Sequence, residues 1–495
     1  MRLAFDTPLE DLAWTQQPLV PTIAPKHYEE SQAFPWFAAN APKSVLDELI
    51  DEGINGASNF FAKREIIDEF GWRNFGDLFA DHETLYQAEG ETPFISHYNN
   101  QYDAIYGFAR QFALTGDRRW FELMDDLARH VTDIDIYHTD EDRAEYNHGL
   151  FWHTDHYLTA HTATHRTFSR DNDTSSTPGQ TGGGPAAEHC YTTGLAFHYF
   201  LTGNAASKQT VAALTNWMIT LHDGGQGLLA RLWAIKRDDL GRLKLHIKGQ
   251  TVSPYAYPFT RGTGNYITAL MDAFEVTEHT YYLSKAEAVI RGTLHPRDDI
   301  QNRNLLDVEL AWSYLVLLSS LGRFLNLKNK FSQWDDAFYY TKAAFLHYTN
   351  WMRQNEQPFL ADPTQLEFPN DTWVAQDIRK AMLMFQAAEL SPSQAAQYQA
   401  KGQEWLNEVE QHIEHSKTKH FARIQIILLQ NHGPQQARKC YESKAFSETD
   451  IDYGEAPKLS TVKLGADLLS KSITGLLEFR PKREKAWLDA RLNRS

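Results

Sequence analysis

The sequence predicts a mainly α-helical protein folded as an α/α toroid, in which each helix of an inner ring is followed by an outer helix. Pairs of helical segments recur along most of the 495-residue chain. Two inner helices are predicted to end at Thr115-Gly116 and Thr202-Gly203, where the next residue is an Asp or Asn able to cap the following helix, and Thr277 ends a weaker copy. The first helix of each pair is also the more apolar one. A solenoid open at both ends would have the same periodicity.

The elements are expected in a simple order along the chain. Prolines recur from Pro8 to Pro42 without helical periodicity, so residues 1–43 are predicted to form an extended arm. Residues 44–440 would form the toroid domain, and residues 441–495 a C-terminal tail with a helix packed on the toroid. The predicted helix pairs are 44–52 with 60–70, 100–112 with 120–131, 185–201 with 211–221, 263–274 with 281–290, 307–321 with 334–351, and 373–388 with 393–412.

The inner helices are predicted to begin at the same mouth of the toroid, near Asn100, Pro185, Thr263, Leu305 and Asp371. The long insertions between pairs would gather there, and loops on a rigid scaffold are common places for binding sites. These insertions are residues 133–184, 223–262 and 355–370. Within the second insertion, residues 242–248 alternate apolar and polar side chains, which predicts a two-stranded segment.

Composition excludes several classes of protein. The formal net charge of −16 argues against a nucleic-acid partner, because such a partner requires a basic surface. No apolar run approaches the length that crosses a membrane, and the first residues lack the apolar core of a signal peptide. Cys190 and Cys440 are the only cysteines, so no disulfide framework is implied. We therefore expect a cytoplasmic protein without a membrane partner.

The stretch from Tyr137 to Gly194 is the candidate active site. Many of the chain's 21 histidines lie there among Trp, Tyr and Gly residues, and no amphipathic helix accounts for such a density of imidazole. The candidate proton-transfer residues are His153, His156, His189 and Tyr191. The alternative for this stretch is a metal site, but the spacing of its candidate ligands matches no zinc signature; they are His153, Asp155, His156, His161 and His165. No metal or other cofactor is therefore expected.

A helix is predicted to begin at Pro185, directly after three glycines. Gly183 and Gly184 would let a ligand approach the backbone, and the free N–H groups of a helix start attract a carboxylate. Glu188 and His189 would then lie one turn inside this helix. A flexible turn with proline at the first helical position is the structural alternative.

Further candidates lie outside this stretch as well as in it. Arg73, Arg166 and Arg261 could clamp a carboxylate through two parallel hydrogen bonds, with ordinary ion pairs as the alternative. Aromatic and polar side chains would contact a sugar substrate. They are Trp72, Asn74, Gln101, Asp103, Trp152, Glu188, Trp373 and Asp377, together with Gly183, Gly184 and Arg261.

Several motifs together resemble one family, the exo-acting rhamnogalacturonan lyases and their bacterial relatives. The motifs are Gly71–Asp77 with His82-Glu83, Asn100–Asp103, Asp133–His138, and Gly182–Gly194. The resemblance covers roughly residues 55–390 and includes motifs long enough to indicate homology. It implies an α/α toroid catalytic domain that acts on acidic, pectin-like sugars by β-elimination. Members usually carry β-sandwich domains on both sides of the toroid, for which this chain leaves too little sequence before Gly71.

The sequence leaves three functions open. A β-elimination lyase acting on an acidic oligosaccharide or polysaccharide needs an Arg to neutralise the uronate carboxylate, a base and an acid, all of which the candidates provide. A glycoside hydrolase on the same toroid would need two carboxylates, either Glu188 with Asp103 or Asp77 with Asp377. The third function is a non-catalytic carbohydrate-binding or assembly protein. The excess of histidine over paired carboxylates favours the lyase.

Overall fold

The computed structural model describes residues 19–88, 90–93, 95–151, 185, 187–250, 252–437 and 451–492. Within these ranges the protein is mainly helical, as predicted, and extended segments pair only through isolated bridges: Phe79 with His97, Ile136 with Leu150, and Phe151 with Pro185. None of the described helices is both long and apolar enough to cross a membrane.

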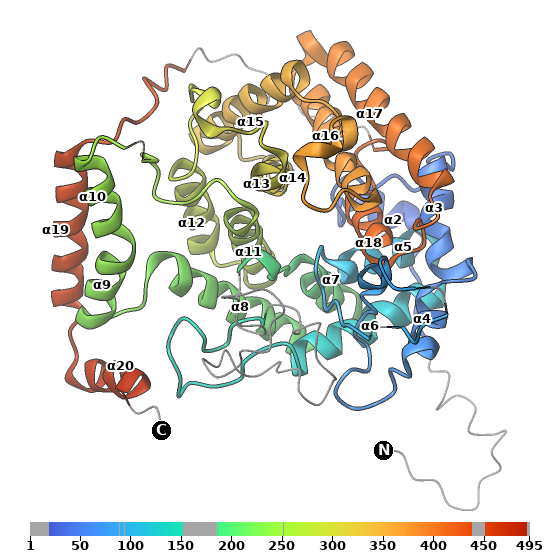
Figure 1. Cartoon of the computed structure of the whole chain (residues 1–495), viewed down its shortest axis with the longest axis horizontal. Helices are drawn as coiled ribbons and strands as arrows, with labels where there is room; N and C mark the ends of the chain where they lie inside the picture. The colour runs from blue at the N-terminus through green and yellow to red at the C-terminus, as the bar shows by residue number, and fades with distance from the viewer. Residues whose placement is uncertain are drawn as a thin grey trace, which may run out of the picture.

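One series of helices is buried on almost every side and makes up most of the core (Figure 1). These helices are α5 (Ala104–Thr115), α7 (Thr193–Thr202), α11 (Arg261–Thr277), α14 (Tyr314–Lys330), α16 (Asp371–Leu390) and α18 (Ala422–Asn431). Each packs against the next in this order, and α18 packs against α5, so the series of contacts returns to its start. A helix that is buried all round is expected to be apolar all round, in agreement with the compact inner segments predicted from the sequence.

A second series of helices packs outside the first. It consists of α3 (Val45–Asn55), α6 (Arg118–Asp133), α8 (Ala205–Asp223), α12 (Thr280–Arg291), α15 (Asp336–Asn355) and α17 (Ala395–His415). Each contacts at least one helix of the first series: α6 contacts α5, α8 contacts α7 and α11, and α12 contacts α11. Likewise α15 contacts α14 and α16, α17 contacts α16, and α3 contacts α18. These helices bury one face, as α6 does with Trp120, Leu123 and Leu127.

The predicted stop-and-cap motifs are confirmed in two pairs. Gly116 and Gly203 end α5 and α7 in the left-handed region, with φ of 68° and 71°. The next residue then caps the outer helix: Asp117 accepts a hydrogen bond from Arg119 N, and Asn204 accepts one from Ala206 N, both at 2.9 Å. The local sequence therefore sets the turn between the inner and the outer helix.

The last pair joins two segments that are far apart in the sequence, which the prediction missed. We expected residues 44–52 and 60–70 to form a pair of their own. Instead α3 packs against α18 and α17, and α4 (Phe60–Ile67) makes a smaller contact with α3. The apolar face of α3, formed by Leu46, Leu49 and Ile50, fits the buried surface of α18. No local pattern distinguishes this pairing from a local hairpin.

Two further predictions about helices and strands are wrong. Residues 240–247 form helix α10, not strands, because they pack along α19 (Thr461–Leu477) and follow directly from a helical segment at residues 228–239. No helix begins at Pro185, which pairs with Phe151 in a bridge. The chain makes the short turn η3 (Ala187–His189), and α7 begins only at Thr193.

The remaining elements complete the chain. They are α2 (Pro25–Glu30), η2 (Asp81–Thr84), α9 (Leu228–Ala234), the π-helix η4 (Ile235–Asp239), η5 (Ile300–Arg303), α13 (Val308–Ala311), η6 (Phe359–Ala361), η7 (Pro363–Gln365), η8 (Pro392–Gln394) and α20 (Pro481–Leu492). The described part of the arm contains α2 and a buried aromatic group in which Phe34 stacks on Phe197 of α7 at 4.3 Å. In the tail, α19 packs against α9 and α10, and α20 packs against α9.

Candidate functional site

The starts of the buried helices meet at one end of the helix series, beginning with α18, α5 and α7. Arg423, in the first turn of α18, donates a hydrogen bond to the Tyr98 hydroxyl at 3.2 Å. The Tyr98 ring lies 6.4 Å from that of Tyr102, which lies 6.1 Å from that of Tyr191. Tyr98 and Tyr102 precede α5, and Tyr191 precedes α7. These contacts therefore bring the starts of three helices together.

The same end continues through α11, α14 and α16. Arg261, the first residue of α11, donates to His189 Nε2 at 3.3 Å and lies 5.5 Å from the ring of Trp312, just before α14. Trp312 meets Trp373, in the first turn of α16, edge to face at 6.0 Å. Arg379, two turns into α16, lies over the Tyr102 ring at 5.3 Å. The side-chain contacts thus return to the starting point.

We call this group the mouth cluster. Its members are Tyr98, Tyr102, His189, Tyr191, Arg261, Trp312, Trp373, Arg379 and Arg423. Three guanidinium groups face three phenols and an imidazole within it, although the chain as a whole has a net charge of −16. The cluster is therefore a local concentration of positive charge in an acidic protein, which favours an anionic ligand.

A cavity of about 120 Å³ lies directly beneath the mouth cluster. Tyr191 and Arg379 line it at the mouth, Arg323 and Gln386 line it farther in, and Trp36 of the arm borders it as well. The lining thus combines a few polar groups with a larger share of apolar surface, to which Trp36 of the arm contributes. A sugar ring bound at the mouth would find both hydrogen-bonding groups and apolar surface.

The loop before α5 has an unusual backbone. Asn99, Tyr102 and Asp103 all have positive φ, of 45°, 62° and 61°. This region is costly for residues other than glycine, and especially for a bulky one, so surrounding contacts must hold it. The Asp103 carboxylate provides one such contact, because it accepts hydrogen bonds from the backbone N–H of Gly194 at 3.0 Å and of Tyr106 at 3.4 Å. The strained loop holds the Tyr102 ring against Tyr191.

Neighbouring helices also fix the segment that carries His189. The Asn265 side-chain amide donates to the carbonyl groups of Ala187 and Glu188, both at 3.1 Å. Farther along, the Thr192 and Thr193 hydroxyls donate to Asp272 of α11. Because these groups bind the chain on both sides of His189, α7 starts late and His189 lies in η3 facing Arg261. His189 therefore lies before α7, and not one turn inside a helix as predicted.

The hydrogen bond between Arg261 and His189 defines the protonation state of the histidine. A guanidinium has only donors, so His189 Nε2 must accept the bond and must carry no proton. His189 is thus a neutral imidazole with its basic nitrogen directed at Arg261. Nearby, burial raises the pKa of Tyr191 to about 12, although the Arg261 and Arg379 charges oppose the shift. Tyr191 is accordingly a protonated phenol at neutral pH.

Buried carboxyl and imidazole groups around the cluster are also perturbed. Burial raises the pKa of Asp103 to about 7, and the negative charge of Asp272 adds to the shift. Burial lowers the pKa of His82 well below its usual value, helped by the Arg423 charge. The His82 ring meets Tyr98 edge to face at 5.4 Å. The buried groups beside the mouth cluster are therefore uncharged or easily neutralised. They compete little with an anionic ligand for the arginines of the cluster.

The structure brings some of the candidate residues together. His189, Tyr191, Arg261 and Trp373 belong to the mouth cluster, and Asp103 lies just behind it. The Glu188 side chain is partly exposed and fills the space that Gly262 leaves by having no side chain. Gln101 is buried, and its side-chain oxygen accepts no hydrogen bond from a described residue. The candidates that lie outside the described residues are Trp152, His153, His156, Arg166, Gly183 and Gly184.

Other candidates are held elsewhere. Trp72 is 77% exposed, and Arg73 and Asn74 lie in the same turn at residues 71–75. Asp377 forms an ion pair with Lys380 at 2.9 Å and accepts a hydrogen bond from Phe359 N, so it supports η6. Asp77 lies in a separate buried group with His130.

Five members of the mouth cluster were not predicted from the sequence as site residues: Tyr98, Tyr102, Trp312, Arg379 and Arg423. Each lies within about two turns of the start of a buried helix. Tyr102 and Arg379 fall inside motifs that were noticed for their neighbours, Asp103 and Asp377. The position of a residue relative to a predicted helix start was a usable signal. Arg423 had no such signal, because α18 itself was not predicted.

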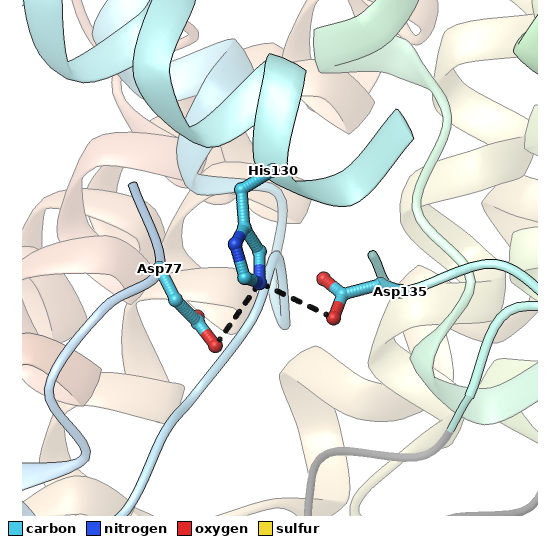
Figure 2. A group of neighbouring side chains, drawn as sticks. All are labelled: Asp77, His130 and Asp135. Carbon is cyan, nitrogen blue, oxygen red and sulfur yellow. Dashed lines mark ion pairs between the residues drawn. The ribbon is translucent and has the colours of Figure 1, made fainter. Parts of the chain in front are cut away.

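One group of side chains among the described residues has the arrangement of metal ligands (Figure 2). Asp77, His130 and Asp135 each offer a ligand atom, and these atoms lie within 4.8 Å of one another. His130 is near the end of α6, and the two carboxylates belong to the loops that lead toward Tyr98 and toward residue 151. The group lies outside the mouth cluster but at the base of the loops that border it.

No protein-family model matches this sequence, and no curated protein matches it.

Proposed function

We propose that the protein is a carbohydrate-active lyase that cleaves uronate-containing glycans by β-elimination at the mouth cluster. We also infer that the closed series of helix contacts is an α/α toroid, with the mouth cluster at the opening where its inner helices start. The observation that supports the function best is the meeting of Arg261, Arg379 and Arg423 with tyrosines and a neutral histidine beside a cavity that Tyr191 and Arg379 line.

The arginines would bind the carboxylate of the substrate. A guanidinium binds a carboxylate through two parallel hydrogen bonds, and neutralising the carboxylate makes the hydrogen on the adjacent carbon more acidic. Arg261 makes a hydrogen bond to His189 and stacks near Trp312 but forms no recorded ion pair with a described carboxylate. An anionic ligand would compete for Arg261 with the Glu188 carboxylate, whose charge acts on this guanidinium. Arg379 borders the cavity and donates to Gln376 and Gln430, which are neutral.

His189 would remove the proton. Its Nε2 atom carries a lone pair that Arg261 occupies in the ligand-free protein. When Arg261 turns to the substrate carboxylate, that lone pair becomes free at the place where the acidified C–H bond must lie. Breaking this C–H bond and the neighbouring C–O bond creates a carbon–carbon double bond conjugated to the carboxylate. The base thus becomes active only when a carboxylate is bound.

Tyr191 would donate a proton to the leaving oxygen. With a pKa of about 12 it holds its proton at neutral pH, and its hydroxyl makes no hydrogen bond of ordinary geometry to a described residue, although Asn265 lies close to it. A buried donor without a fixed partner can turn toward a substrate oxygen. Trp312 and Trp373 are partly exposed at the rim and would stack on a sugar ring.

The carboxylate pairs of the hydrolase alternative have other partners. Asp103 accepts backbone hydrogen bonds at the start of α5, and Asp377 is paired with Lys380. Two free carboxylates on either side of a glycosidic bond are the minimum for that reaction. Asp103 and Asp377 already have these partners, so they do not form the free pair that a hydrolase needs. This favours the lyase over the hydrolase.

The test is incubation with oligosaccharides that contain galacturonate or glucuronate. A lyase gives a product with ultraviolet absorbance from the new conjugated double bond, and Tyr191→Phe should lower this rate by about 10²-fold or more. Tyr266→Phe is the matched control, because Tyr266 is a fully buried tyrosine of α11 that donates to Asp223 and is not a member of the mouth cluster. New reducing ends without absorbance would establish hydrolysis. Binding without turnover would establish a carbohydrate-binding protein.

A further inference from the structure

The buried group at the end of α6 is more than an ion pair. Asp77, His130 and Asp135 have fully buried side chains, each 0% exposed. His130 Nε2 lies 3.4 Å from Asp77 Oδ2 and 3.4 Å from Asp135 Oδ1, so one nitrogen faces two carboxylates (Figure 2). Two buried carboxylates need a compensating positive charge, because an uncompensated buried charge is strongly destabilising. The compensating charge is either a proton on His130 or a bound cation.

The separations favour a cation. A protonated histidine holds a carboxylate by a charge-assisted hydrogen bond of about 2.7–2.9 Å. Two atoms that both bind Zn²⁺ at about 2.0–2.1 Å with tetrahedral geometry lie about 3.3–3.4 Å apart. Both separations from His130 Nε2 are 3.4 Å. They are long for hydrogen bonds but match the edge of a zinc coordination tetrahedron.

The orientation of His130 is also that of a metal ligand. Its Nδ1 atom lies 3.2 Å from the Phe75 carbonyl oxygen, which can only accept a hydrogen bond. Nδ1 therefore carries a proton; a neutral ring then has its lone pair at Nε2, toward the two carboxylates, whereas a doubly protonated ring directs a second N–H there. A hydrogen bond from the second ring nitrogen to a backbone carbonyl is the usual support of a zinc-bound histidine.

A second pair of buried side chains completes the surroundings. His97 is 6% exposed and Glu69 is 2% exposed, and their ring nitrogens and carboxylate oxygens make no hydrogen bond to a described residue. His97 Nδ1 lies 3.9 Å from Asp77 Oδ2 and 3.4 Å from Glu69 Oε1. His97 Nδ1 thus lies between Asp77 and Glu69, closer to Glu69, with which it is within ion-pair distance. It is the nearest candidate for a fourth ligand, with Glu69 behind it.

We propose that Asp77, His130 and Asp135, with His97 as the fourth ligand, bind one divalent cation of the zinc class as a structural site. A buried site with no open position fits a structural cation better than a catalytic one. The cation would fasten two loops to α6. The first loop contains Asp77 and pairs with residues 96–98, because the Leu78 carbonyl accepts a hydrogen bond from Tyr98 N. The second loop contains Asp135, whose carbonyl accepts a hydrogen bond from Phe151 N. The site would thereby hold Tyr98 in the mouth cluster.

The proposal is tested by metal analysis of the full-length protein. The protein is stripped with a chelator, incubated with ZnCl₂, freed of unbound metal and measured by mass spectrometry for zinc content. We expect about one zinc per chain and a raised melting temperature. Replacement by Co²⁺ should give the visible absorption of a tetrahedral cobalt site. A zinc content far below one per chain would overturn the proposal and identify His130 as a protonated partner of the two carboxylates.

Variants distinguish this site from binding elsewhere, for example by the histidine-rich stretch at residues 153–165. Asp135→Asn should weaken zinc binding by more than about 100-fold, because even partners of a ligand contribute 10–100-fold. Asp126→Asn is the matched control: Asp126 is a largely buried carboxylate on α6, the helix that carries His130, and it is paired with Arg64 at 2.8 Å. Equal zinc binding by Asp135→Asn, His130→Gln and the wild type would overturn the proposal. None of these measurements depends on the proposed lyase activity.

Discussion

The two ends of the buried helix series each contain an arginine bonded to a histidine, and the two pairs differ in what else holds them. At the end covered by the arm, Arg110 donates to His432 Nδ1 at 3.3 Å and also to the carbonyl groups of Pro35 and Trp36. His432 in turn bonds Asp47 at 2.7 Å through its other nitrogen. These hydrogen bonds join α5, the end of α18, α3 and the arm to one another.

At the mouth, the corresponding pair is less completely held. Arg261 also donates to a histidine at 3.3 Å, and it lies against Trp312. Among the described residues, no hydrogen bond from Arg261 to a backbone carbonyl is found. Arg261 is partly exposed, whereas Arg110 is 1% exposed. The same two residue types thus form a structural joint where the arginine donates to three acceptors, and a candidate site where the hydrogen bond to His189 is the one found for it among the described residues. Three experiments test this difference.

The largest expected effect is on stability at the covered end. Arg110→Gln removes bonds to His432, Pro35 and Trp36 and leaves their acceptors buried, so we expect a loss of about 3 kcal/mol in the free energy of unfolding. Denaturant unfolding measures it. Arg119→Gln is the control, because its ion pair with Asp117 is exposed and should contribute less than about 1 kcal/mol. Equal losses of unfolding free energy in the two variants would show that Arg110 stabilises the protein no more than an exposed ion pair does.

The next effect is on activity at the mouth. His189→Gln keeps a similar size but cannot take up a proton, so turnover should fall by about 10²-fold, equivalent to about 2.7 kcal/mol in the activation barrier, while the melting temperature changes little. The control is His198→Gln, since His198 is a buried histidine bonded to Asp125 and Ser207, both at 2.8 Å. It should lose stability and keep activity. A reversal of this pattern would remove His189 from the mechanism.

The smallest effect is a pH dependence at the covered end. Burial lowers the pKa of His432, and the Arg110 charge lowers it further against the opposing effect of Asp47. The unfolded chain therefore binds a proton that the folded protein does not, once the pH falls below about 6.5. This contribution to stability is present above that pH and is lost as the pH decreases, by on the order of 1.4 kcal/mol for each unit of pKa shift. His432→Gln should lose less stability than the wild type between neutral and mildly acidic pH, measured by denaturant unfolding. Parallel pH profiles would contradict this assignment.

Much of the candidate site could be predicted from the sequence, and the part that could not has a physical cause. His189 and Tyr191 were predicted beside the helix start expected at Pro185, Arg261 as a carboxylate clamp, and Trp373 as an aromatic side chain near a helix opening. Their partner Arg379 was not predicted, because its contact is with the ring of Tyr102 from a distant part of the sequence. That ring is positioned by the left-handed backbone conformation of Tyr102. The histidine-rich stretch at residues 152–166, central to the sequence prediction, lies outside the described residues, and its role stays a prediction.

The sequence by itself determined the helical class, most helix pairs and the stops at Gly116 and Gly203, because capping and helix periodicity depend on residues only a few positions apart. Tertiary structure decided where α7 begins, that α3 pairs with α18, and that Asp77 meets His130 and Asp135. Each of these outcomes depends on contacts between distant segments, such as the hydrogen bond that joins Asp47 to His432 across 385 positions. A local pattern cannot specify such contacts, because the free energy that selects them arises only when the buried helices pack together.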